Sequence, residues 1–164
     1  MTQTRIPAAA AMIRAVEWSN PELRDGPATN FNGTLLRFLS DDRPSQRDRL
    51  WFTMEESVFS QGYVFNAAEP TIAVLLASLL DDLADPVRIA VLDLLFLLTQ
   101  GAYARHDQVG LACMERIKEG AWLLSGIAIS GPEWATNACL EILDLFAGAC
   151  VTIVRTVLAL NEEA

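Results

Sequence analysis

The stretch LLDDLADPVRIAVLDLLFLLTQG, residues 79–101, sets a polar corner between two apolar runs. Before the corner, apolar residues within 72–83 recur at helical spacing, which predicts one apolar face of a helix. Asp85 and Pro86 are residue types that begin helices, so we expect Asp85 to cap a second helix. That helix is apolar on almost every side, which predicts an inner helix that ends at Gly101.

The corner predicts two antiparallel helices, with Arg88 reaching back to the acidic end of the first one. The same pattern occurs earlier in the chain. A shift of about 40 residues aligns Gln61-Gly62 with Gln100-Gly101 and places the acidic corner at 41–44 close to the polar corner within 79–86. Residues 142–147, further along the chain, repeat residues 91–96 less closely. Helix pairs repeated in this way predict an all-α fold, namely one domain built as a short α-solenoid of stacked antiparallel helix hairpins.

The repeat divides the chain into four consecutive parts. These are an N-terminal helix and loop that cap the fold (1–32), a first helix pair (33–66), a second helix pair (67–101) and a longer, irregular C-terminal unit with its cap (102–164). Within the C-terminal unit we expect a helix break near Gly120 or Gly126, a corner at Gly131-Pro132, and a last helix with a bend at Gly148.

The order of a helix, an acidic corner and a helix that opens with Val87-Arg88 resembles a HEAT-type repeat. Two stretches resemble, more narrowly, an uncharacterised group of HEAT-like proteins common in actinobacteria and related bacteria. They are GPATNFNGTLLRFLSDD at 26–42 and SQGYVFNAAEPTIAVLLASLL at 60–80. Members of the group often have a histidine where this chain has Ser60. The resemblance implies a fold and no reaction, because a fold does not define an activity.

Composition and charge limit the possible partners. The chain has 164 residues, of which 52% are hydrophobic, and a net charge of −9. Nucleic-acid binding needs clustered Lys and Arg, so the acidic balance argues against a nucleic-acid partner. Fifteen of the 21 acidic residues lie after residue 50. An acidic body of this kind favours a basic protein as partner.

Few residues suggest catalysis, metal binding or membrane insertion. Cys113, Cys139 and Cys150 lack metal-like spacing, and we expect free thiols in a cytoplasmic protein. His106 is the single histidine, so no histidine-based metal site or catalytic pair is expected. Charged residues interrupt the long apolar stretch at 138–160, which argues against a membrane span. We therefore expect no cofactor and no metal ion.

Asp93 and Asp144 interrupt two apolar helices at matching positions of the repeat. Because the second helices of HEAT-like solenoids line the concave face, the resemblance implies an acidic binding surface there. The alternative is that each carboxylate is buried in a hydrogen bond or an ion pair, for instance with Arg88 or Arg155. The candidate partner-binding residues are Asp93, Asp144, Glu55, Glu56, Glu141 and, as an aromatic anchor beside a corner, Trp134.

These features favour a non-enzymatic protein-binding module. A specific hypothesis is an immunity-type or inhibitory protein that covers a basic toxin domain, since such pairs use acidic groups opposite cationic sites. The first alternative is an adaptor or regulatory subunit of a larger complex, self-associating as a homodimer through apolar solenoid ends. The second alternative is an enzyme that uses carboxylates such as Asp93 and Asp144 in the concave groove.

Overall fold

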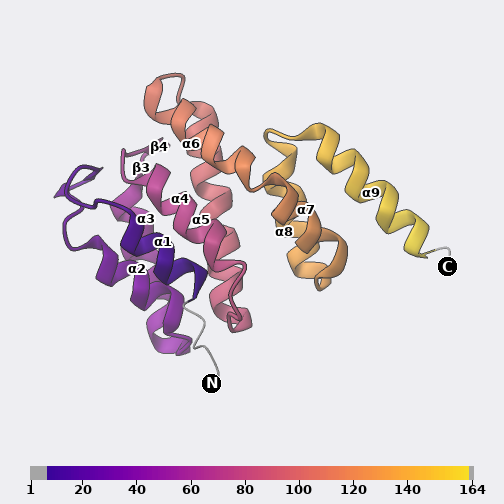
Figure 1. Cartoon of the computed structure of the whole chain (residues 1–164), viewed down its shortest axis with the longest axis horizontal. Coiled ribbons are helices and arrows are strands. Elements are labelled where there is room, and N and C mark those ends of the chain that lie inside the picture. The colour runs from indigo at the N-terminus through magenta and orange to yellow at the C-terminus, as the bar shows by residue number, and fades with distance from the viewer. Residues whose placement is uncertain (1–6, 163–164) are drawn as a thin grey trace.

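The computed structural model describes residues 7–162, and most of these residues are helical (Figure 1). The helices are α1 (Ala8–Ala15), α2 (Phe31–Ser40), α3 (Pro44–Val58), α4 (Ala68–Ser78), α5 (Asp85–Ala104), α6 (Gln108–Glu119), α7 (Ala121–Ser130), α8 (Glu133–Asp144) and α9 (Gly148–Glu162). Two short antiparallel hairpins pair β1 (Glu22–Leu23) with β2 (Gly26–Pro27), and β3 (Phe59–Ser60) with β4 (Tyr63–Val64). The all-α prediction is confirmed.

The helix α5 is the inner helix of the fold, as its sequence predicts. It contacts α2, α3, α4, α6 and α8, and the strand β4 as well. Leu92, Leu94, Leu95 and Leu98 on this helix are almost completely buried. Burial of one leucine side chain stabilises a fold by about 2 kcal/mol, so the position of α5 determines where its neighbours pack.

The predicted ends of α5 are wrong. Ala84 is the cap residue and makes no side-chain cap bond, while Asp85 already lies in the first turn, where its charge suits the helix dipole. Gly101 lies inside the helix, which continues to Ala104. A Cβ atom at Gly101 would lie 2.7 Å from Cε2 of Phe59. This glycine therefore allows the β3–β4 hairpin to approach α5 closely and does not end the helix.

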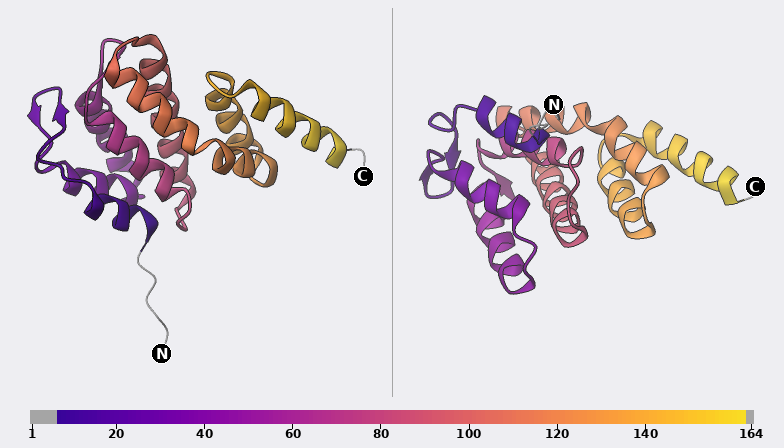
Figure 2. Two further views of the ribbon diagram at one scale, coloured as in Figure 1. Left: turned by 45° about the horizontal axis from the view of Figure 1, so that its top comes forward. Right: turned by 60° about the horizontal axis from the view of Figure 1, so that its bottom comes forward.

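Three helix corners, at residues 41–43, 79–84 and 131–132, lie on the same side of the molecule (Figures 1 and 2). The helices α3, α5 and α8 each begin at one of these corners and therefore run in the same direction. α5 contacts both α3 and α8. At the second corner, Arg88 reaches back as predicted, but Nη2 meets the backbone oxygen of Asp81 at 3.5 Å, not a carboxylate.

The C-terminal unit breaks at Gly120, between α6 and α7, and not at Gly126, which lies inside α7. The single bent helix predicted after Pro132 is instead two helices, α8 and α9. Val151 and Val154 in the first half of α9 are buried, and this helix contacts α7 and α8. The rest of α9 projects away from the other helices (Figures 1 and 2).

One helix within residues 7–162, α5, is long and apolar enough to cross a membrane by length and composition alone. More than half of its apolar window is buried inside the fold. The core helix of a soluble protein has these same properties. The central position of α5 is compatible with that case.

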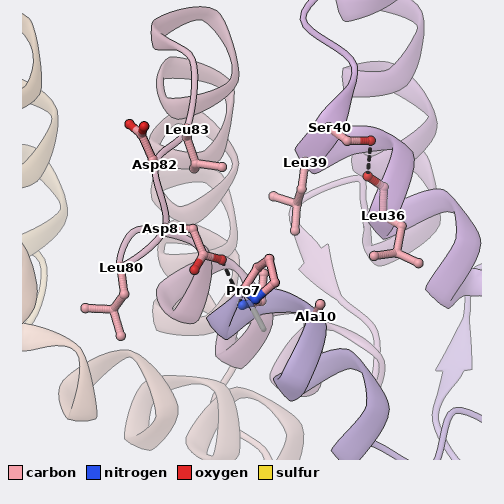
Figure 3. Close-up of a pocket in the computed structure, with 10 residues that line it drawn as sticks. Pro7, Ala10, Leu36, Leu39, Ser40, Leu80, Asp81, Asp82 and Leu83 are labelled. Atoms are coloured by element: carbon pink, nitrogen blue, oxygen red, sulfur yellow. Dashed lines mark hydrogen bonds between the residues drawn. The ribbon is translucent and has the colours of Figure 1, made fainter. Parts of the chain in front are cut away.

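The short helix α1 is capped by a residue from the second corner. Both carboxylate oxygens of Asp81 accept backbone hydrogen bonds, from the N–H of Ala8 at 2.7 Å and of Ala9 at 3.0 Å (Figure 3). Pro7, the residue directly before α1, makes no side-chain cap bond. α1 packs on α4, where its Ile13 side chain is buried. Asp81 therefore fixes the N-terminal helix on the second helix pair.

We expect Asp81→Ala to lower the free energy of unfolding by about 1 kcal/mol, because two N–H groups lose their acceptor. Amide hydrogen exchange in α1 should also accelerate. Asp82→Ala is the matched control, since Asp82 is exposed and points away from α1 (Figure 3). Urea unfolding and hydrogen-exchange mass spectrometry measure both effects. Equal effects of the two substitutions would contradict the capping role.

Gly110→Ala should destabilise the protein by about 2 kcal/mol, because the new methyl group overlaps backbone atoms. A Cβ atom at Gly110 would lie 2.0 Å from the backbone oxygen of Arg105. Gly126→Ala is the matched control within a helix, because no atom lies within 4 Å of a Cβ there. That change should stabilise by up to about 1 kcal/mol through helix propensity. Thermal unfolding measures both variants: we expect a lower melting temperature for Gly110→Ala and an equal or higher one for Gly126→Ala.

Candidate functional site

The parallel helices α3, α5 and α8 carry all the residues predicted to bind a partner. The carboxylates and the tryptophan are distributed as Glu55 and Glu56 on α3, Asp93 on α5, and Trp134, Glu141 and Asp144 on α8. Glu55 and Trp134 are half-buried, whereas the other four residues are exposed. We call these six residues, which belong to three neighbouring helices, the acidic face.

Asp93 on α5 and Glu141 on α8 belong to two helices in contact, and their carboxylates are near enough to repel each other. Partial burial by the neighbouring helices raises the pKa of Asp93, and repulsion from the Glu141 carboxylate raises it further. Neither residue has an ion-pair partner within residues 7–162. The structure thus holds two carboxylates together at an exposed position without a counter-charge.

Asp144, at the end of α8, points to a different neighbour. Its Oδ2 lies 3.3 Å from Nη2 of Arg155 on α9, and both side chains are more than half exposed. The predicted partner of Asp144, Arg155, is therefore present, but the pair lies at the surface and is not the buried interaction that we expected. An exposed pair of this kind contributes little to stability, about 1 kcal/mol at most. Asp93 and Asp144 consequently do not act together, and Glu141 takes the place beside Asp93.

A groove of about 390 Å³ runs between α3 and α5 on the acidic face. Its lining residues are Arg47, Asp48, Trp51, Pro86, Ile89, Ala90 and Asp93. Asp93 was predicted from the sequence, whereas the apolar walls of the groove were not. A signal was present: Pro86, Ile89, Ala90 and Asp93 follow helical spacing, so they occupy one side of α5. Which helix faces that side depends on tertiary packing and could not be predicted.

Arg47 lines this groove, and its guanidinium group binds backbone oxygens at the corner between α2 and α3. Only 8% of the residue is exposed. Nη1 donates to the backbone oxygens of Phe38 at 2.6 Å and Asp41 at 2.9 Å, and the guanidinium lies 4.8 Å from the Phe38 ring centre. Burial lowers the pKa of Arg47. The exposed charges of the groove are therefore those of Asp48 and Asp93, and both are negative.

Two of the three cysteines, Cys113 and Cys139, are buried free thiols. Burial raises the pKa of the Cys113 and Cys139 thiols to about 12, so both stay protonated. His106 is exposed in the loop before α6, where the neighbouring Asp107 accepts hydrogen bonds from the N–H groups of Val109 and Gly110. Within the described range, 7–162, no three His, Cys, Asp or Glu side chains gather as metal ligands would.

Another hollow, of about 590 Å³, lies between α1, α2 and the second corner (Figure 3). Its walls are mainly leucine side chains, including Leu36, Leu39, Leu80 and Leu83. The Asp81 carboxylate in this hollow is engaged with α1. The hollow thus offers apolar surface and few free polar groups, and we consider the acidic face the better candidate site.

The fold is all-α, and its acidic face holds two carboxylates, those of Asp93 and Glu141, without an ion-pair partner among the described residues. A scan against protein-family models, a search of curated proteins and a search of solved structures each found no match to this chain. The functional interpretation below therefore depends on the geometry of the chain itself.

Asp93→Asn should raise the melting temperature at about pH 7, because the ionised carboxylate is disfavoured in the folded protein. The folded chain holds this proton more tightly than the unfolded chain. Asp93 therefore contributes stability below its ordinary pKa of 3.8 and loses that contribution as the pH rises through the raised value. The advantage of the variant should shrink toward about pH 3. Circular dichroism melts across this range, with Glu56→Gln as control, measure the effect.

Proposed function

We propose that this chain is a non-enzymatic protein-binding module whose acidic face binds a basic protein. The observation that carries the proposal is the pair Asp93 and Glu141, two neighbouring carboxylates without a counter-charge among the described residues. Repulsion between these two carboxylates lowers the stability of the unbound protein, and an approaching cation reduces that repulsion. Binding sites commonly retain groups that reduce stability in this way.

The architecture we propose is a short α-solenoid of HEAT type. Its hairpins would be α2–α3, α4–α5 and α7–α8, with α6 as an additional helix. The common side of the three corners and the parallel course of α3, α5 and α8 support this assignment (Figure 2). Solenoids present a stiff, extended surface made by their second helices, which suits a protein partner.

The specific form we favour is an immunity-type or inhibitory protein that covers a basic toxin domain such as a nuclease. The net charge of −9 and the exposed carboxylates of the acidic face support this form. A cationic substrate site on the toxin would be the complementary surface. We propose a cytoplasmic location, supported by the three free cysteines.

A self-associating adaptor is the second candidate. The observation that favours it is exposed apolar surface away from the acidic face. Trp122 on α7 is 73% exposed, and Leu111 on α6 and Ile153 on α9 are exposed as well. A carboxylate enzyme has less support, because Asp144 pairs with Arg155 and does not join Asp93.

A binding experiment with charge-matched variants tests the proposal. The wild-type chain, Asp93→Lys/Glu141→Lys and the control Asp82→Lys/Glu115→Lys are immobilised and exposed to an extract of the source cells. We expect a basic protein to bind to the wild type and the control, to fail to bind the acidic-face variant, and to elute as salt rises from about 50 to about 300 mM. If no basic protein distinguishes the two double variants, the acidic face is not the binding site.

A further inference from the structure

We infer that the groove between α3 and α5 holds an amphipathic helix of the basic partner. An apolar side chain of that helix would fill the groove, and its Lys or Arg side chains would contact Asp48 and Asp93. This inference rests on the proposed function and names the element that the acidic face recognises.

The groove has the length and the walls that such a helix requires. From Pro86 to Asp93 it follows α5 for about two turns, or roughly 10 Å. Ile89, between these two residues, is 42% exposed, and Trp51 and Ala90 form the remaining apolar wall. Amphipathic helices place apolar anchors at i, i+3 or i+4 and i+7, which matches a groove two turns long.

Two carboxylates line the groove, Asp48 from α3 and Asp93 from α5. Because α3 and α5 run in the same direction and Asp48 is near the start of α3, we infer that Asp48 lies toward the end of the groove that Pro86 begins. Asp93 lies at the other end and is joined there by Glu141 from α8. A helix with an apolar residue flanked by basic residues one turn away on each side would satisfy both ends.

An anionic ligand fits this groove less well than a cationic one. Arg47 is the basic residue that lines it, and Nη1 is used by two backbone oxygens of the first corner. Nε and Nη2 of Arg47 have no partner among the described residues, but both atoms are closed to solvent. They offer nothing to an incoming anion, whereas the Asp48 and Asp93 side chains are exposed.

Charge and apolar contact should contribute separately measurable parts of the affinity. Contacts between Asp93 and a basic side chain are screened by salt, so their loss reduces the salt dependence of binding. Burial of Ile89 against an apolar side chain does not involve charge, so its loss weakens binding equally at all salt concentrations. A purely electrostatic surface would show the first effect without the second.

The test uses two synthetic peptides of the same composition. One carries a leucine stripe at helical spacing flanked by lysines, and the other has the same residues scrambled so that the stripe is lost. Fluorescence anisotropy measures their affinity for the wild type, Ile89→Ser, Asp93→Asn and the control Leu111→Ser. Leu111 is an exposed leucine on α6, remote in sequence from the groove. We expect tight binding of the striped peptide alone, about tenfold weaker binding to Ile89→Ser, and no change for Leu111→Ser.

The outcomes separate this inference from the proposed function. If both peptides bind alike, or if Asp93→Asn weakens binding and Ile89→Ser does not, the helix-in-groove inference is overturned while a charge-selective acidic face remains. If neither peptide binds but a basic protein still depends on Asp93 and Glu141, the partner uses another element and the inference is again overturned. If neither peptide nor any basic protein responds to these carboxylates, both proposals fail.

Discussion

Burial of α5 is the constraint on which the other features of this structure depend. Its leucines are removed from water by helices on several sides, so α5 acts as the common neighbour of the first and last helix pairs. α3 and α8 are each positioned against it. The spacing of the carboxylates on three separate helices is therefore set in the core, and the acidic face inherits the rigidity of the core packing.

The open side of α5 explains why a carboxylate can persist in so apolar a helix. Its exposed residues fall on one narrow stripe that includes Pro86, Ile89, Asp93 and Gln100. A charge anywhere else on the middle turns would be buried and unpaired, which folding would not tolerate. Asp93 is tolerated because it lies on this stripe, yet its neighbours still remove part of its water. A carboxylate at this position is therefore tolerated by the fold, and its partial loss of water makes the binding of a cation favourable.

Helical periodicity was sufficient to predict the all-α class, the inner helix and the first two corners, at 41–44 and within 79–86, because these features depend on local spacing. The dipeptide Gln-Gly shows where local reasoning stops. Gln61-Gly62 forms the turn of the β3–β4 hairpin, with φ angles of 51° and 85°, whereas Gln100-Gly101 continues a helix. Gln61-Gly62 is a hairpin turn, whereas Gly101 allows another segment to approach its helix closely. Contacts between residues distant in sequence determine which of these two structures the same dipeptide adopts. Likewise, Asp93 was predicted from its sequence context, but its pairing with Glu141 required the packing of α5 on α8.

The bond from Asp81 to the start of α1 has a consequence for biosynthesis. α1 leaves the ribosome before the carboxylate that caps it, because that carboxylate belongs to the second corner, more than 70 residues later. A peptide of eight residues has little tendency to stay helical by itself in water. This helix must therefore wait for the synthesis of the second corner before it can adopt its final position on α4.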